Sequence, residues 1–189
     1  MTIKVLVPLA EGFEEIETVT IVDVLRRAEI EVTLAGLSPG PILGSRGMRL
    51  QADADWAAID PAAFDGIVLP GGMGGTLNMI ESEGVLQAVR SFFDAGKLTA
   101  AICAAPMVLS AAGIVGERPI TAHPGVHEKL AGTRLRVDER VVRSGNLLTS
   151  QGPGTAMEFA LALVEHLAGE ALARELASSM VVEAVAGPN

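Results

Sequence analysis

An uncharged stretch of eighteen residues, 98–115, constrains the fold of this chain more than any other part of the sequence. Its first five residues, 98–102, are apolar, as the residues of a buried strand are. From Pro106 onward the stretch predicts a helix, because proline is tolerated in a first helical turn. Between these two parts stands Cys103, with a small residue two positions away on either side. This spacing is typical of a nucleophile elbow, in which a strand turns sharply into a helix and presents one side chain at the turn.

Cys103 is the only cysteine in the chain, and its surroundings support two interpretations. At the N-terminus of a helix the dipole lowers the pKa of a thiol, which favours a reactive thiolate. Free cysteine is also among the residue types that are most often buried in the core. The local pattern alone leaves both interpretations open.

Short apolar segments alternate with segments of helical periodicity along the chain. This alternation predicts an α/β fold with a mostly parallel sheet covered on both faces, in one domain over residues 1–185 with a tail at 186–189. Functional sites in such sheets form beyond the carboxyl ends of the strands. The predicted strands are 3–9, 31–36, 66–70, 98–102, 140–143 and 147–150, and the predicted helices are 14–28, 84–94, from 106 onward, 125–131, 152–167 and 170–178.

Composition and charge argue against several classes of function. The 189 residues carry a formal net charge of −9 without a long basic run, which argues against binding to the phosphate backbone of nucleic acids. A single cysteine excludes an internal disulfide and a cysteine-cluster metal site, and it suits the reducing cytoplasm. Pro106, many small residues and the lack of basic or aromatic flanks argue against a membrane span at 98–115. We therefore expect a cytoplasmic protein without a metal centre.

Glu17 is the most informative carboxylate in the sequence. It lies one helical turn before Ile21, on the apolar stripe of the predicted helix 14–28. Burial would raise the pKa of Glu17, so that the carboxyl group stays protonated and can donate to a thiolate. The alternative is that the stripe begins after Glu17 and leaves its carboxylate exposed. Glu14 and Glu15 are expected in solvent, because acidic residues suit the first turn of a helix.

The remaining candidates are backbone donors and a histidine. Gly72, in the glycine-rich loop 71–75, and Ala104 can each present a backbone N–H to a developing oxyanion, although a plain turn also explains the glycines. His123 precedes a proline at a predicted strand end, and it is the candidate base for Cys103. We expect His127 to be exposed and His166 to be structural.

Six segments that occur in order along the chain together carry a resemblance. They are similar to the ThiJ/PfpI superfamily, and within it to the branch of the parkinsonism-associated deglycase and its bacterial YajL-like relatives. Each segment alone is moderately specific, but the set is strong and spans residues 3 to about 182. The segments are 9–18, 22–28, 69–72, 100–104, 123–124 and 148–155.

The resemblance implies a flavodoxin-like three-layer sandwich that forms a homodimer. By position, Cys103 would be the elbow nucleophile, Glu17 the protonated partner of its thiolate and His123 the nearby base. Gly72 and Ala104 would supply backbone N–H groups.

The resemblance also assigns residues outside the elbow. Asp23, Arg27 and Arg46 fall where the family forms its dimer interface near the site; without the resemblance, Arg27 and Arg46 are ordinary surface cations or groups that hold an anion near the thiolate. The sequence departs from close relatives at Met73 and Ala105, and Gln151 stands where some members have a cation, which leaves the substrate preference open.

The first functional hypothesis is an enzyme that needs no cofactor. A thiolate at Cys103 would attack the aldehyde of methylglyoxal, glyoxal or their adducts on proteins, Glu17 would move protons, and the product would be a hydroxy acid. The second hypothesis is an oxidative-stress sensor or chaperone, in which Cys103 is oxidised to a sulfinic acid. A PfpI-type cysteine peptidase is less well supported, because that branch has histidine directly after the elbow cysteine and Ala104 stands here.

Overall fold

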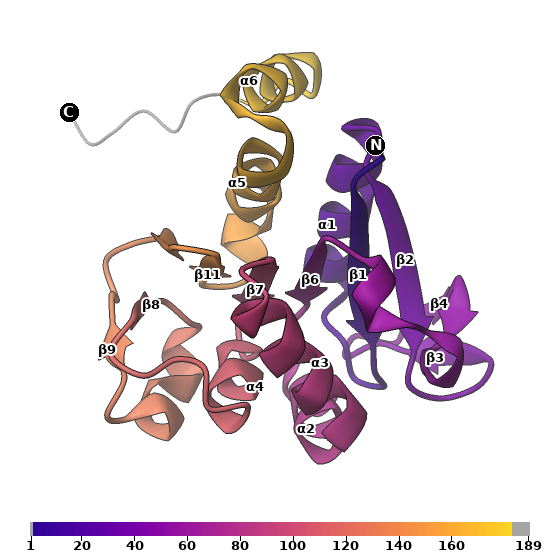
Figure 1. Ribbon diagram of the computed structural model, residues 1–189, viewed down its shortest axis with the longest axis vertical. Helices are drawn as coiled ribbons and strands as arrows, with labels where there is room; N and C mark the ends of the chain where they lie inside the picture. Colours follow the sequence, from indigo (N-terminus) through magenta and orange to yellow (C-terminus); the bar gives the residue numbers. More distant parts are fainter. Residues whose placement is uncertain (1, 183–189) are drawn as a thin grey trace.

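The computed structural model describes residues 2–182, so the predicted tail at 186–189 lies outside the described residues. One sheet of seven strands, in the order β10-β11-β7-β6-β1-β2-β5, forms the centre of the fold (Figure 1). All neighbouring strands in it are parallel except β10 and β11, which form an antiparallel hairpin. The strands are β1 (Lys4–Leu9), β2 (Glu31–Gly36), β5 (Ala54–Asp55), β6 (Gly66–Leu69), β7 (Leu98–Ile102), β10 (Val141–Ser144) and β11 (Leu147–Ser150).

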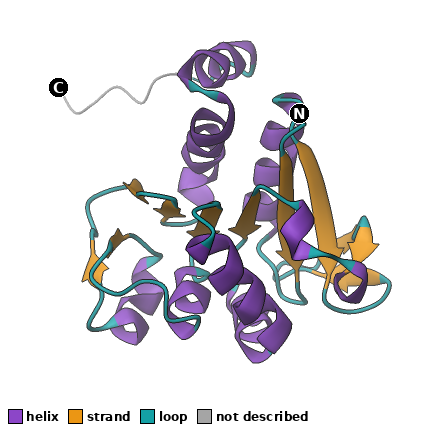
Figure 2. Ribbon diagram, in the orientation of Figure 1, coloured by secondary structure: helices purple, strands orange, loops and turns teal. Residues whose placement is uncertain are grey.

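Helices cover both faces of this sheet, as the alternation predicted (Figure 2). Figure 1 shows α2–α4 on one side of the strands and α5 and α6 on the other, and α1 packs against α5. The order β2-β1-β6-β7-β11 is the flavodoxin-like strand order, so the predicted three-layer fold is confirmed. The helices are α1 (Glu15–Arg27), α2 (Met73–Glu81), α3 (Glu83–Asp94), α4 (Pro106–Ala111), α5 (Ala156–Ala168) and α6 (Glu170–Ser179).

Short elements complete the fold at its edges. Pro41–Leu43 (β3) and Arg49–Gln51 (β4) form an antiparallel hairpin, and Pro119–Ile120 (β8) pairs in parallel with Arg134–Leu135 (β9). None of the helices within residues 2–182 has the length and apolar character to cross a lipid bilayer. The 3₁₀ helices are η1 (Trp56–Ala58), η2 (Pro61–Ala63), η3 (Pro124–Leu130) and η4 (Pro153–Thr155).

Two hydrophobic clusters lie on opposite faces of the sheet. Successive residues of β1 alternate between them: Leu6 packs in the cluster under α2–α4, whereas Val5 and Val7 pack in the cluster under α1 and α5. Each of these side chains is completely buried, and its burial stabilises the folded state by about 1.5–3 kcal/mol relative to an exposed position. The two-sided burial explains why the parallel strands are continuous apolar runs in the sequence.

Helix α2 was not predicted, because its second and third residues are Gly74 and Gly75, and glycine disfavours a helix interior. The glycines are needed for packing. A Cβ atom on Gly74 would lie 3.2 Å from the Cα of Gly12, and one on Gly75 would lie 3.1 Å from the Cα of Phe13. Helix α2 therefore begins where two loops pack backbone against backbone, at the carboxyl edge of the sheet.

Candidate active site

Cys103 lies at a sharp turn between β7 and α4, where the elbow pattern predicted it. Its φ angle of 65° is in the left-handed region, which is uncommon for a residue with a side chain and is found at strained functional turns. The turn is fixed on both sides, because the Cys103 N–H donates to Ser150 O at 3.0 Å and the His123 N–H donates to Cys103 O at 2.9 Å. The side chain is half-buried, so the thiol is neither an inert core group nor freely exposed.

Glu17 is fully buried in the first turn of α1, as its position on the apolar stripe predicted. Its Oε2 oxygen accepts a 2.8 Å hydrogen bond from Gly71 N–H, and its carboxyl group faces the Cys103 thiol. The fit is tight, because a Cβ atom on Gly71 would lie 2.5 Å from both Glu17 Oε2 and Cys103 Cβ. Among the described residues Oε1 has no hydrogen-bond partner, which leaves it free to exchange a proton with the thiol or with a bound substrate.

The two side chains shift the pKa of each other. Burial is the main cause that raises the pKa of Glu17 to about 7. Burial, followed by the negative charge of ionised Glu17, raises the pKa of the Cys103 thiol to about 12. The prediction of a lowered thiol pKa is therefore wrong while Glu17 is ionised, and helix α4, with six residues, has only a short dipole to oppose these effects.

The pair nevertheless has a route to a thiolate. Above about pH 7 Glu17 and Cys103 together hold one proton. When that proton moves from sulfur to Glu17, the carboxyl group becomes a neutral donor and its negative charge no longer opposes the thiolate. Gly72 N–H and Ala104 N–H both donate toward the sulfur and lower the thiol pKa. These two backbone donors, which were predicted to face an oxyanion, thus face the sulfur itself.

His123 follows β8 and borders the same pair, but its hydrogen bond differs from the one expected of a base for the thiol. Its Nδ1 accepts a 3.1 Å hydrogen bond from Gly125 N–H, so the neutral ring carries its proton on Nε2. A Cβ atom on Gly152 would lie 3.2 Å from His123 Cδ2 and 4.0 Å from Glu17 Oε1, which places the ring and the carboxyl group around one glycine. In this tautomer His123 is a donor, and Glu17 is the group placed to take the thiol proton.

The other two histidines do not join this group. His127 is half-buried rather than exposed, because its Nε2 hydrogen-bonds to Ala122 O at 3.1 Å. His166 lies on α5, where burial and the nearby charge of Arg143 lower its pKa. Neither histidine is among the groups that shift the pKa of Cys103 or Glu17, and the structural role of His166 stays a prediction.

Asp23, Arg27 and Arg46 lie outside the buried pair. Arg27 Nε and Asp23 Oδ2 form an exposed i,i+4 ion pair at 2.7 Å on α1. Arg46 lies in the turn of the β3–β4 hairpin, where its side chain is exposed. The described residues also contain no group of three His, Cys, Asp or Glu side chains that could hold a metal ion.

Glu15 is buried, so the prediction that its side chain lies in solvent is wrong. It is only 5% exposed, and it holds the hairpin turn through Ser45 Oγ (3.0 Å), Arg46 N–H (2.5 Å) and Met48 N–H (3.4 Å). Burial opposes its ionisation, but these hydrogen bonds lower the pKa of Glu15 below its usual value. Glu15 therefore fixes the hairpin that carries Arg46 to the helical turn that carries Glu17. The sequence did not predict a role for Glu15 beside Glu17, because residues at positions i and i+2 of a helix face different directions.

The raised pKa of Glu17 predicts a pH-dependent stability. The folded state holds the Glu17 proton more tightly than the unfolded state does, so the stabilising contribution is complete below the unfolded pKa near 4.5 and is lost as pH rises to about 7. The loss amounts to about 3 kcal/mol. Glu17→Gln keeps an acceptor for Gly71 N–H and has no proton to lose. Urea unfolding at a series of pH values should therefore show that this variant lacks the decline that the wild type shows.

The exposed Glu128 supplies the matched control for this experiment. Glu128→Gln should retain the wild-type pH dependence, because it leaves the buried carboxyl group of Glu17 unchanged. Parallel curves for the wild type and Glu17→Gln would contradict the raised pKa.

Several known proteins are similar to this chain over most of its length. The DJ-1/PfpI family profile matches residues 3–166. Protein dj-1beta of Drosophila melanogaster is 44% identical over 184 residues, which cover 96% of this chain and 98% of that protein. The glutathione-independent glyoxalase DJR-1.2 of Caenorhabditis elegans is 40% identical over 160 residues, covering 84% and 85%. The crystal structure of Drosophila DJ-1beta matches with a TM-score of 0.94 at 43% identity, covering 97% of this chain and 100% of that one. The chain therefore belongs to the DJ-1/PfpI family.

Proposed function

We propose that the protein is a cofactor-independent glyoxalase and deglycase that acts on methylglyoxal, glyoxal or the adducts that they form on proteins. The observation that carries this proposal is the buried carboxyl group of Glu17 against the thiol of Cys103, with Gly72 N–H and Ala104 N–H directed at the sulfur. One site thus combines a nucleophile, a proton carrier and two N–H groups that donate hydrogen bonds to the thiolate. The similarity to a glutathione-independent glyoxalase supports the same chemistry.

The first half of the reaction forms a covalent adduct. Glu17 takes the proton of the thiol, and the thiolate forms a C–S bond with the aldehyde carbon of methylglyoxal. The aldehyde oxygen then receives the proton held by Glu17 and becomes a hydroxyl group. Glu17 is ionised again at the end of this step, which prepares it to act as a base.

The second half is an internal oxidation and reduction. Glu17 removes the hydrogen of the former aldehyde carbon as a proton and returns it to the neighbouring carbon, while the hydroxyl proton passes to the ketone oxygen. The aldehyde carbon is thereby oxidised to a thioester and the ketone is reduced to an alcohol. His123 assists as a donor to the ketone oxygen from Nε2. Water then hydrolyses the thioester to a hydroxy acid and the free thiol, so the reaction requires no external oxidant or reductant.

The half-buried thiol also favours a second candidate function. Mild peroxide would convert Cys103 to a sulfinic acid, whose oxygens could accept hydrogen bonds from Gly72 N–H and Ala104 N–H. The chain has no second cysteine to resolve a sulfenic acid as an internal disulfide. In this alternative the protein is a cytoplasmic redox sensor or chaperone, and the cytoplasm is also where we expect a glyoxalase with a reduced thiol to work.

Replacing the nucleophile separates these candidates. Cys103→Ser should lower the conversion of methylglyoxal to lactate by at least about a thousandfold, because the thiol forms the covalent intermediate. Lactate production measured beside wild type and Glu128→Gln, an exposed control, would test this. A wild-type protein that fails to convert methylglyoxal but gains two oxygen atoms at Cys103 in peroxide, as seen by intact mass, would instead favour the redox sensor.

The pKa of Glu17 predicts the pH profile of turnover. The reactive form of the pair holds one proton, so kcat/KM should rise with pH through about 7 and then level off. Glu17→Gln cannot carry a proton, and we expect it to lower turnover about a hundredfold or more and to remove this rise while the thiol stays oxidisable. Unchanged turnover in Glu17→Gln would exclude the acid–base role.

We also propose that the active protein is a homodimer that forms through the exposed side of α1. Large apolar side chains are exposed there and on the adjacent hairpin: Ile16 is 57% exposed, Val19 45% and Met48 56%. A surface cavity of about 290 Å³ adjoins them and includes Val22 and Leu50. Burying this face against a second copy would bring Arg27 and Arg46 to an interface near the thiol.

Introducing a charge on this face should dissociate the dimer. Val19→Asp would place a carboxylate in the apolar contact, and we expect light scattering to show a monomer where the wild type is a dimer. Val137→Asp is the matched control, since Val137 is 52% exposed on a different part of the surface. A wild-type monomer at micromolar concentration would contradict the proposed interface.

A further inference from the structure

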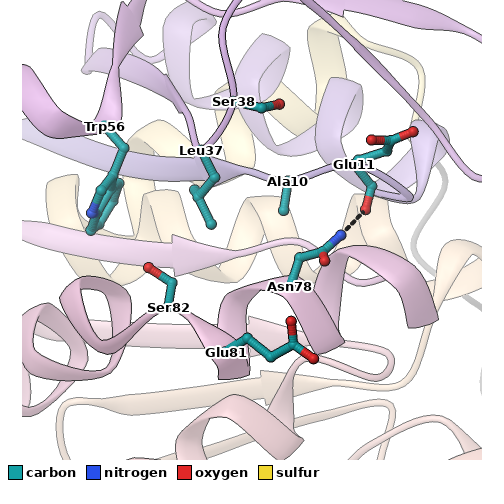
Figure 3. A pocket seen from close by; sticks show the side chains of 8 residues that line it. All are labelled: Ala10, Glu11, Leu37, Ser38, Trp56, Asn78, Glu81 and Ser82. Atoms are coloured by element: carbon teal, nitrogen blue, oxygen red, sulfur yellow. Dashed lines mark hydrogen bonds between the residues drawn. The ribbon is translucent and has the colours of Figure 1, made fainter.

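A cavity of about 330 Å³ opens at the carboxyl edge of the sheet, and Cys103 is not among the residues that line it. Its walls come from four separate parts of the chain: the loop after β1, the loop after β2, helix η1 and the end of α2 (Figure 3). Its volume is within the range of small-molecule sites. The lining residues are Ala10, Glu11, Leu37, Ser38, Trp56, Asn78, Glu81 and Ser82.

The cavity has an aromatic end and an acidic end. Figure 3 shows the indole of Trp56 at one end and Glu11 at the other, with Leu37 and Ala10 between them and Glu81 on the facing wall. None of the eight lining residues is Lys, Arg or His, so the walls provide no cation to neutralise the two carboxylates. The lining thus combines an apolar surface with an unbalanced negative charge.

Two contacts hold the acidic end in shape. The side-chain amide of Asn78 donates to Glu11 O at 2.9 Å, and it lies between Glu11 and Glu81 in Figure 3. The tight backbone packing of Gly74 against Gly12 fixes the start of α2 to the same loop. The two carboxylates are therefore carried by segments that are already joined in the free protein, which lowers the entropic cost of binding a cation near them.

The aromatic end is also fixed. Trp56 packs with its indole Nε1 close to the start of α3, where a Cβ atom on Gly84 would lie 3.1 Å from that nitrogen. The indole is only half-buried, although tryptophan usually buries most of its large apolar surface. A ligand in the cavity would cover the part of the indole that remains exposed.

We propose that this cavity is a second binding site, separate from the thiol, that takes a small organic amine. The protonated amino group would lie beside the carboxylate of Glu81, with the negative charge of Glu11 at the same end of the cavity, and the apolar body would pack on Leu37 and Trp56. The carboxylates repel an anion, and a neutral apolar ligand would leave them without a counter-charge. A divalent metal is a poorer match, because the described residues contain no cluster of three suitable ligands.

Trp56 makes the site directly observable. It is the only tryptophan, and the chain has no tyrosine, so the intrinsic fluorescence of the protein reports on this cavity. We expect hexylamine, titrated into the full chain at pH 7 and low salt, to change the fluorescence saturably. Hexanol, which has the same apolar body without the charge, and ammonium chloride, which has the charge without the body, should each bind at least tenfold more weakly.

Substitution tests the acidic end. Glu81→Gln should raise the Kd for hexylamine about tenfold, Glu11→Gln should raise it by a smaller factor, and added salt should raise it further. Both side chains are exposed, so the variants should fold, and Glu128→Gln, another exposed glutamate, should keep the wild-type Kd.

Three results would overturn the proposal: no saturable change with hexylamine, equal affinity for hexanol, or an unchanged Kd in the Glu11→Gln/Glu81→Gln double variant. Cys103→Ala should bind hexylamine as the wild type does. This variant therefore tests amine binding separately from the reaction proposed for the thiol, so one proposal can fail while the other holds.

Discussion

The proton shared by Glu17 and Cys103 is the interaction on which the site depends. A carboxyl group that is completely buried is costly to ionise, so its preferred state is neutral, and a neutral carboxyl group is a hydrogen-bond donor. Burial of the thiol works against the thiolate in the same way, and the backbone donors of Gly72 and Ala104 oppose that effect. The reactivity of the thiol is thus set by which of the two groups holds the proton, and the dipole of the short helix α4 is secondary.

Glycines at the carboxyl edge of the sheet allow these groups to approach one another. At Gly71 a side chain would collide with Glu17 and Cys103 at 2.5 Å, and at Gly72, which has a φ of 88°, a Cβ atom would lie 2.3 Å from Gly12 O. With no side chain at either position, Gly71 N–H reaches the carboxylate and Gly72 N–H reaches the sulfur. The Gly-Gly pair after β6 is therefore required by contacts on both sides of it.

The sequence predicted the sheet, its main helices and the burial of Glu17, because these follow from apolar periodicity, which is a local property. It did not predict what depends on contacts between distant segments. The hydrogen bonds that bury Glu15 come from a hairpin about thirty residues away, and helix α2 depends on packing against Gly12. The tautomer of His123 depends on a hydrogen bond from the backbone of Gly125, and the pKa of Cys103 depends on the charge of a residue on another element.

The site is a source of instability that the remainder of the fold offsets. A non-glycine residue at positive φ costs on the order of 1–3 kcal/mol, and Cys103 has this conformation at 65°. Glu17 adds a cost that grows as pH rises toward its pKa. Cys103 directly follows β7, whose side chains are buried on the two faces of the sheet, and the backbone of His123 and Ser150 holds the elbow by hydrogen bonds. Glu17 is held by the N–H of Gly71, just after β6. Because the elbow cannot relax without breaking these contacts, the thiol, the carboxyl group and the backbone donors keep their positions before any substrate binds.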